Sequence, residues 1–374
     1  MTANNHNIKL DVRQANSSVA AEIYISATPK ETLPAAEQAE LLFTAVRDAL
    51  ITNNACILQE RVFGTVAAMK ITPQIRSKIY GDIADGVSPT FLVSELGAAG
   101  PLCGVQVYAI RTDNKPQIIN FNGTSCGRIV RLPGVSYLLL SAISESQHDS
   151  PKDQAKAMLE IGESILKQYG VDFRAVPRTW MWLKDVLSWY GDFNRVRNKF
   201  FTERGIIGKG SRQSMPASTG IGLGPSNGAM CAMDLTAVIE PANSIQFLHA
   251  AGKQQCALEY GSAFSRASQM ITPAGKTVFI SGTASIDASG ATTNIGNAAA
   301  QINDTIENVR AVLRDMNCSD EDVVQVVAYC KTAEVEKIFN TVKSNLDWPW
   351  VTAICDICRD DLLFEIEAAA LIAN

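Results

Sequence analysis

The last twenty residues, CDICRDDLLFEIEAAALIAN, place two carboxylates in a segment that has the pattern of a buried strand. Glu365 and Glu367 are two residues apart, so in a strand both side chains point to one face, opposite Phe364 and Ile366. A carboxylate in an apolar strand is costly unless it is hydrogen-bonded or used in chemistry. Burial raises the pKa of a glutamate and keeps it protonated, which suits a proton donor. Glu365 is therefore a candidate general acid, with a hydrogen-bonded structural carboxylate as the alternative, and Glu367 is interpreted as structural.

Cys355 and Cys358, just before this strand, have the C-x-x-C spacing of redox pairs and half zinc sites. On a strand, residues three apart point to opposite faces, and neither a second pair nor a nearby histidine completes a metal set. The chain has three histidines, none in a recognisable nucleophile motif. We therefore expect no metal, no dithiol chemistry and no histidine-dependent triad.

The composition is that of a folded protein. At 374 residues, with 47% hydrophobic and 19% charged residues, the chain is longer than one ordinary core, which favours two or three domains or repeated units. The formal charge of −5 argues against a general nucleic-acid binder, which needs a basic face. The nine scattered cysteines, without a signal peptide or a membrane-length apolar run, predict a reduced, cytoplasmic protein with no membrane partner.

Two segments of the chain align without a gap. QAKAMLEIGESILKQYGVDFRAVPRTWMWLKD (154–185) and QINDTIENVRAVLRDMNCSDEDVVQVVAYCKT (301–332) each combine a helical pattern, a turn and an apolar strand run. In this register Trp182 falls on Tyr329. The segment DFNRVRNKFF, which follows the first copy, echoes IFNTVKSNL, which follows the second. This repetition indicates a duplicated unit.

Strands flank both copies. SYLLLSAIS and TVFISGTASID precede them, and AMDLTAVI and LFEIEAAA follow, aligned so that Asp234 takes the place of Glu365. A shorter third copy is suggested by EIYISATP, QAELLFTAVRDALITNN and CILQERVFGT, although its second half is not recognisable.

The repeats predict an α+β fold of β-α-β-α-β units in series, with helices on one face of mixed sheets. We expect an N-terminal α/β domain at 1–120, a first repeated unit at 121–245 and a C-terminal unit at 246–374 that carries the candidate acid.

The C-terminal unit resembles the RidA/YjgF family of small enamine/imine deaminases, which have a chorismate-mutase-like fold. SGTASID, the helix ending VRAVL, VVQVVAYCK and FEIEAAAL carry this resemblance. It implies that Glu365 faces the site. The family usually holds the substrate carboxylate with an arginine whose place falls near Trp350 here, which argues against simple imine deamination. RidA-like units usually form trimers with sites between neighbours, which implies either a monomer that imitates a trimer or a homotrimer.

From about residue 120 onward the chain is similar to the chorismatases, which fuse an N-terminal region to a RidA-like core and convert chorismate to pyruvate and a ring product. WLKDVLSWYGDFNRVRN, PASTGIG, YGSAFSRAS, SGTASID and CRDDLLFEIE carry this similarity, in the family order. The resemblance implies chorismate as the small-molecule substrate and no organic or metal cofactor.

The chorismatase resemblance also implies roles for two residues. Enol-ether cleavage begins with protonation of the terminal methylene, and Glu365 matches the family's proton donor. Cys358 matches the cysteine of the subgroup that makes 3-hydroxybenzoate, whereas the subgroup without it makes a dihydroxycyclohexadiene carboxylate. We therefore expect 3-hydroxybenzoate, with the 3,4-dihydroxycyclohexa-1,5-dienoate or 4-hydroxybenzoate as alternative ring products.

The two carboxylates of chorismate need donors, for which guanidinium groups are best suited. We expect Arg266 to bind one of them, with Tyr260 beside it. Weaker arginine candidates are Arg195, Arg197, Arg128 and Arg131. Ser218, Thr219 and Thr283 offer hydroxyl and backbone N–H groups to a carboxylate or an oxyanion, and an ordinary glycine-rich turn is the alternative.

Other functional classes have less support. The glycines of TGIGLGPSNG lack the G-x-G-x-x-G spacing and precede a strand, which argues against nucleotide binding. The aromatic and basic residues at 180–201 could stack on single-stranded nucleic acid, but their spacing favours the core. A RidA-type imine deaminase and a non-enzymatic binding protein remain alternatives, and the latter would tolerate Glu365→Gln.

Overall fold

The N-terminal part of the chain is a complete β-β-α-β-α-β-β unit. The computed structural model describes residues 7–208 and 214–373. The first unit comprises β1 (Ile8–Asn16), β2 (Ala20–Pro29), α1 (Ala35–Thr52), β3 (Cys56–Gly64), α2 (Val66–Met69), α3 (Thr72–Tyr80), β4 (Thr90–Val93) and β5 (Leu102–Thr112). The second half of this unit, which the sequence pattern did not reveal, is built from short elements: α2 and β4 have four residues each.

The middle unit has the same plan. It comprises β6 (Gln117–Phe121), β7 (Thr124–Leu132), β8 (Val135–Ser144), α4 (Pro151–Gln168), β9 (Arg178–Leu183), α5 (Val186–Glu203), β10 (Ala217–Ile221), β11 (Gly224–Pro225) and β12 (Cys231–Glu240). The amphipathic helix α4 begins at a Ser150 cap whose side chain accepts a hydrogen bond from the Asp153 N–H.

The C-terminal unit repeats the plan a third time. It comprises β13 (Gln246–Leu248), β14 (Ala267–Thr272), β15 (Gly275–Ala284), α6 (Ala298–Asp315), β16 (Val323–Cys330), α7 (Ala333–Val342), β17 (Trp350–Ile354) and β18 (Phe364–Ala373). Helix α6 has 18 residues, as α4 does, and the Asn297 side chain caps it at the Ala300 N–H.

The described residues form three six-stranded mixed sheets. Their strand orders are β1-β2-β5-β3-β4-β11, β10-β9-β12-β8-β7-β6 and β13-β14-β15-β18-β16-β17. In each sheet the last strand of the unit is inserted between the two strands that flank the first long helix: β5 lies between β2 and β3, β12 between β8 and β9, and β18 between β15 and β16. The α+β fold of repeated RidA/YjgF-like units with helices on one face of each sheet is therefore confirmed.

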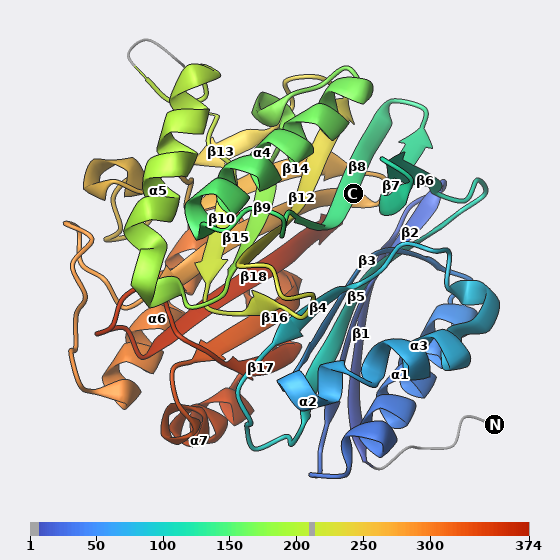
Figure 1. Cartoon of the computed structure of the whole chain (residues 1–374), viewed down its shortest axis with the longest axis horizontal. Helices are drawn as coiled ribbons and strands as arrows, with labels where there is room; N and C mark the ends of the chain where they lie inside the picture. The colour runs from blue at the N-terminus through green and yellow to red at the C-terminus, as the bar shows by residue number, and fades with distance from the viewer. Residues whose placement is uncertain (1–6, 209–213, 374) are drawn as a thin grey trace.

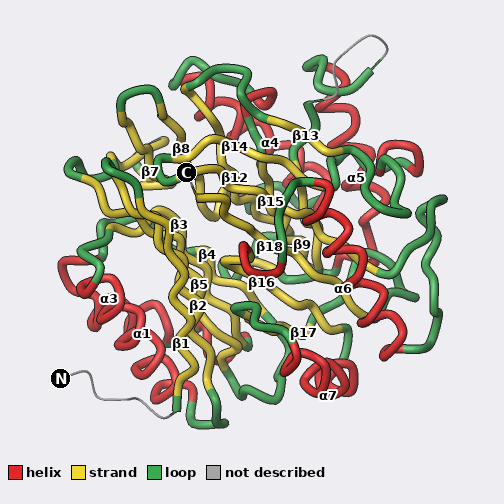
Figure 2. The backbone as a smooth tube through the Cα atoms, turned by 180° about the vertical axis from the view of Figure 1, so that it is seen from behind, coloured by secondary structure: helices red, strands yellow, loops and turns green. Residues whose placement is uncertain are grey.

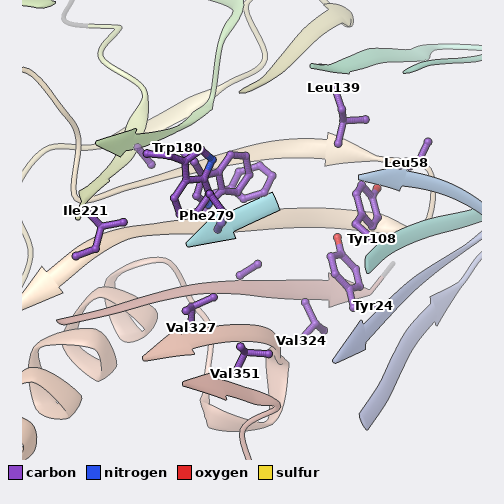
Figure 3. Packing of buried hydrophobic residues seen from close by; sticks show 14 of the residues in the cluster. Tyr24, Leu58, Tyr108, Leu139, Trp180, Ile221, Phe279, Val324, Val327 and Val351 are labelled. Atoms are coloured by element: carbon purple, nitrogen blue, oxygen red, sulfur yellow. The ribbon is translucent and has the colours of Figure 1, made fainter. Parts of the chain in front are cut away.

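The three sheets face one another in the middle of the molecule, and the helices cover their outer faces (Figures 1 and 2). Side chains from all three inner faces form one central hydrophobic cluster, which includes Tyr108, Trp180 and Val327 (Figure 3). Each helical layer packs on its own sheet in a separate cluster. Every sheet is thus buried on both faces, and an inward polar residue must find a partner. No helix in the described part of the chain is long and apolar enough to cross a membrane.

The strand ladders correct the sequence alignment of the two last strands. Asp234 pairs with Trp180 across β12 and β9, and Glu367 pairs with Val327 across β18 and β16. Because the gapless alignment places Trp180 on Val327, Asp234 corresponds to Glu367. The residue that corresponds to Glu365 is Ala232, the second residue of β12.

The corresponding carboxylates Asp234 and Glu367 each make an ion pair that joins two units. The Asp234 carboxylate accepts hydrogen bonds from Arg61 Nε at 2.9 Å, from the Thr90 hydroxyl and from the Ala142 N–H. Glu367 accepts from Arg178 at 2.8 Å. Both pairs are almost fully buried, so they fix how the units fit together.

Candidate active site

A narrow pocket lies between the middle and C-terminal units and gathers most of the candidate residues. Its walls are helix α5, strands β10, β15 and β18, the segment 260–266 and the loop after β17. Of the expected site residues, the structure brings together Glu365, Cys358, Arg266, Tyr260 and Ser218 here. All of these groups come from one chain, two of whose units meet at the pocket.

Glu365 is a buried carboxyl without a hydrogen-bond donor. It is the second residue of β18, it is 4% exposed, and no residue in the described ranges donates a hydrogen bond to it. Burial, and then the charge of Glu367, raises its pKa to about 8, against the opposing effects of Arg359 and Arg178. Glu365 is therefore protonated at neutral pH and free to donate.

Glu367 differs from Glu365 in having its partners built in. Its carboxylate accepts hydrogen bonds from Arg178 at 2.8 Å and from the Trp180 indole N–H at 3.1 Å. The guanidinium of Arg178 also stacks on the Trp180 ring, 4.6 Å from its centroid. Glu367 is thus a structural carboxylate whose oxygens both accept hydrogen bonds, whereas the described residues donate none to Glu365.

The Glu365 carboxyl is seated against Gly282 on β15. A Cβ atom at position 282 would lie 2.1 Å from Glu365 Oε1 and 3.3 Å from Thr219 Cγ2. A side chain larger than hydrogen at this position would displace the carboxyl. The lack of a side chain at Gly282 therefore leaves room for the Glu365 carboxyl.

Cys358 lies in the loop between β17 and β18, as Cys355 does, and not on a strand as the sequence pattern suggested. Both cysteines are free. Cys358 lines the pocket, whereas Cys355 does not. Burial, and then the charge of Glu365, raises the pKa of the Cys358 thiol to about 12. The group is therefore a neutral thiol at physiological pH and not a thiolate nucleophile.

Three guanidinium groups surround the pocket. Arg266 is held by the Gln255 carbonyl oxygen, at 3.0 and 2.7 Å, and donates to the Tyr260 hydroxyl at 2.8 Å. Arg197 is 1% exposed, and its Nε has no partner among the described residues. Arg359 lies over the Tyr260 ring, 5.5 Å from the centroid. An anion that reached this pocket would meet cations that are already oriented.

Several candidates lie elsewhere. Arg195 is on the exposed face of α5 and pairs with Asp192, so it does not line the pocket. The Thr219 hydroxyl accepts from Arg178 and from the Gly282 N–H, and the Thr283 hydroxyl donates to the Ser281 carbonyl oxygen. Neither threonine lines the pocket, and both stabilise its wall through these hydrogen bonds. Two weaker candidates are also remote: Arg128 is paired with Asp85, and Arg131 is exposed on β7.

Trp350 does not belong to this pocket. It packs against Phe339 and Trp348 on the C-terminal unit. In the strand ladders, Trp350 pairs with Val326 and Ser218 pairs with Thr179. Because Val326 and Thr179 take the same position in the aligned repeats, Trp350 and Ser218 correspond to each other. Ser218 therefore occupies that position at the Glu365 pocket, and the residue at 350 does not bear on its chemistry.

Tyr190, Arg197 and Arg359 also line the pocket, but the sequence predicted neither Tyr190 nor Arg359 as a site residue and offered Arg197 only as a weaker candidate. Tyr190 and Arg359 stand inside the quoted motifs, but nothing in their local pattern separates them from surface residues. Arg197 had a signal: it lies four residues after the buried Phe193, so both share the apolar face of α5.

The described residues contain no group of three or more histidine, cysteine, aspartate or glutamate side chains placed to hold a metal ion.

Comparisons with known proteins agree with this architecture. Residues 259–372 match the family model described as Endoribonuclease L-PSP. A chorismatase crystal structure is similar with a TM-score of 0.64 and 19% identity, over 95% of this chain and 100% of that one. The chain therefore has the chorismatase fold with a RidA/YjgF-like core, which confirms the resemblance seen in the sequence at the level of fold.

Single-unit proteins match about a third of the chain. A putative endoribonuclease from Thermotoga maritima has a TM-score of 0.29 and 22% identity, covering 34% of this chain and 99% of that one. A YjgF/YER057c/UK114 family member from Mycobacterium tuberculosis has a TM-score of 0.26 and 22% identity, covering 34% and 100%. The comparison with curated proteins found no match.

Proposed function

We propose that this protein is a chorismatase that cleaves the enolpyruvyl ether of chorismate. The observation that carries the proposal is Glu365, a buried carboxyl whose pKa is raised to about 8, in a pocket ringed by Arg197, Arg266 and Arg359. A protonated carboxyl beside three cations suits a dianionic substrate whose reaction starts with protonation of carbon.

In this mechanism Glu365 gives its proton to the terminal methylene of the enolpyruvyl group. The C=C bond is consumed, a C–H bond forms, and the ether carbon becomes an oxocarbenium ion beside the new Glu365 carboxylate. Water or a ring hydroxyl adds to that carbon and returns a proton to Glu365. The hemiketal formed with water collapses by breaking its bond to the ring oxygen, which takes a proton, and this releases pyruvate. The cyclic ketal formed with the ring hydroxyl releases pyruvate when one ring C–O bond and one ketal C–O bond break; a ring C–H proton is lost, and the oxygen that stays on the aromatic ring takes a proton.

The ring product depends on what happens at the ring. Formation of the dihydroxycyclohexadiene carboxylate consumes one water, whereas formation of 3-hydroxybenzoate and pyruvate consumes none overall. We infer that the neutral thiol of Cys358, which lines the pocket, favours 3-hydroxybenzoate. The proposed enzyme is thus of the 3-hydroxybenzoate synthase type.

The pocket is small for such a substrate. Its volume is about 50 Å³. It nevertheless combines an acid with buried guanidinium groups. The proposal therefore requires the lining side chains to move apart when chorismate binds.

The test is incubation of the purified chain with chorismate, with pyruvate followed by a coupled assay and ring products by chromatography. We expect pyruvate and 3-hydroxybenzoate in equal amounts without added metal or cofactor. Pyruvate with a diene diol would keep the reaction class and remove the role of Cys358. No pyruvate would refute the proposal.

Cys358→Ala is expected to change the product more than the rate. Loss of the thiol should lower the share of 3-hydroxybenzoate and raise that of the diene diol. Cys355→Ala is the matched control, because Cys355 is a free thiol in the same loop but outside the pocket. A product profile unchanged in Cys358→Ala would leave the choice of subtype without support.

Gly282→Ala is expected to reduce turnover by roughly 10²-fold, because its methyl group would displace the Glu365 carboxyl from its reacting position. Gly191→Ala serves as control, since Gly191 does not line the pocket and its added Cβ would meet only Arg195 Nη1, at 3.7 Å. The measurement is chorismate turnover by both variants, and thermal unfolding verifies that both are folded. Equal activity of the two variants would contradict the seating of Glu365 against Gly282.

A further inference from the structure

A second groove, of about 640 Å³, lies between the C-terminal and N-terminal units. Its walls include the ends of β2 and β5, the strand β17 and the residues at the end of α7. In the repeated plan these elements correspond to β15, β18, β10 and α5, which build the Glu365 pocket. The groove is therefore the counterpart of that pocket at another interface between units.

The correspondence extends to a cation. Phe339-Asn340-Thr341-Val342-Lys343 at the end of α7 repeats the pattern of Phe193-Asn194-Arg195-Val196-Arg197 on α5. Lys343 lines the groove as Arg197 lines the Glu365 pocket. One positively charged side chain thus stands at the same place in both sites.

Strand residues correspond as well. Trp350 and Thr352 line the groove from β17, at the ladder positions of Ser218 and Gly220 on β10. Cys103 is the second residue of β5, as Glu365 is the second residue of β18. Cys103 has no ladder partner, because β5 bulges between Leu102 and Gly104, and it lines the groove near the start of that strand.

The cations of the groove are available to a ligand. The two carboxylates in its lining are engaged: Glu336 accepts from the Ala98 N–H at 2.8 Å, and Asp347 pairs with Arg13 at 3.0 Å. Within residues 7–208 and 214–373, the ammonium groups of Lys343 and Lys30 have no ion-pair partner. Lys343 is half-buried above the Phe339 ring.

Two further polar atoms in the lining residues are unpartnered. Trp350 is 5% exposed, and its indole N–H has no acceptor in the described structure. The amide oxygen of Asn340 likewise has no donor there. Both atoms have almost no accessible surface, so a ligand in the groove satisfies them only after the Trp350 and Asn340 side chains turn toward it.

We propose that this groove is a second ligand site, which binds a small organic carboxylate that also carries a hydroxyl group. The ammonium groups of Lys343 and Lys30 bind the carboxylate. The hydroxyl donates to Asn340 Oδ1 and accepts from the Trp350 N–H.

The groove binds this ligand without transforming it. Burial raises the pKa of the Cys103 thiol to about 11, so this groove residue is a weak acid and not a proton donor near neutral pH. This second site follows from the groove alone and does not depend on the chorismate reaction.

The test is isothermal titration of the full chain with 3-hydroxybenzoate, which carries one carboxylate and one hydroxyl. We expect two binding sites per chain, one in each location. Lys343→Met should weaken the groove site at least tenfold, because it removes a charge-assisted hydrogen bond, and Arg266→Gln should remove the other. Lys337→Met, on the exposed face of the same helix, should retain both sites.

The outcomes separate the two proposals. A single site lost in Lys343→Met would support the groove even if chorismate were not cleaved. Binding that Lys343→Met leaves unchanged, whether of one site or two, would overturn the groove proposal. Thermal melting of each variant shows that the loss is not due to unfolding.

Discussion

Glu365→Gln is expected to lower chorismate turnover by roughly 10²–10⁴-fold, the usual contribution of a general acid. The amide has nearly the shape of the protonated carboxyl but no acidic proton. The carboxyl is seated against Gly282 and receives no hydrogen bond from the described residues, so the substitution removes chemistry and little else. Turnover within a few-fold of the wild type would refute Glu365 as the proton donor.

The same substitution should stabilise the protein near neutral pH. The pKa of Glu365 is raised from 4.5 to about 8 in the folded state, so between these values the unfolded chain ionises while the folded one stays protonated. The wild type therefore loses about 1.4 kcal/mol of stability per pH unit from this group as pH rises from 4.5 to 8, and none beyond. Urea unfolding measures the free energy of unfolding of both proteins across this range. The stability of Glu365→Gln relative to the wild type should increase up to pH 8 and stay constant above it.

Wild-type activity has a matching pH dependence. The proton donor is present below the pKa of Glu365 and is lost as pH rises through about 8, so kcat should fall on the alkaline side with a midpoint in that region. A flat profile from pH 6 to 9, with the stability behaviour intact, would mean that Glu365 titrates but does not limit the reaction.

The sequence predicted the faces of the elements better than their register. The alternation in FEIEAAAL placed Glu365 and Glu367 on one face, and the structure shows Phe364 and Ile366 in the helical layer behind. The slip that matched Asp234 with Glu365 is a shift of two residues, which keeps every side chain on its correct face. The pattern therefore could not reveal it, and only the ladder partners fix the register.

Helix position likewise decided between neighbouring charges. Arg195 and Arg197 are about 200° apart on α5, so one faces the core when the other faces water. The apolar residues around Arg197 could have selected it. Arg359 could not have been selected, because its place beside Tyr260 depends on a contact between segments about a hundred residues apart in the chain.

The first half of the N-terminal unit was recognisable because β2, α1 and β3 are long and regular. Its second half replaces one long helix with α2 and α3, which have four and nine residues. The helical pattern of the other two units is interrupted here at Lys70–Ile71, between α2 and α3, and Pro73 lies in the first turn of α3. The N-terminal sheet thus keeps the strand order of the other two units, although its sequence lacks their helical pattern.

Breaking the ion pair between Glu367 and Arg178 is the second change with a large expected effect. Both side chains are about 95% buried or more, and burial lowers the pKa of Arg178 to about 10. Glu367→Leu would leave this cation without its carboxylate and should cost about 3–5 kcal/mol of stability. The double variant Glu367→Leu/Arg178→Met should recover much of that loss, because neither charge is then left alone.

A milder change, Glu367→Gln, tests whether this pair also acts on the proton donor. The amide keeps an oxygen for Arg178 and Trp180 but removes the negative charge, which is the second largest cause of the raised pKa of Glu365. The pKa of Glu365 should therefore fall, and the alkaline midpoint of kcat should move to lower pH. Asp234→Asn is the matched control, because Asp234 takes the same strand position and pairs with Arg61 between the other two units. Both variants should lose stability, but only Glu367→Gln should shift the pH profile. An equal shift in the two would show that general loosening of the core, and not the charge beside Glu365, sets the acidity of the donor.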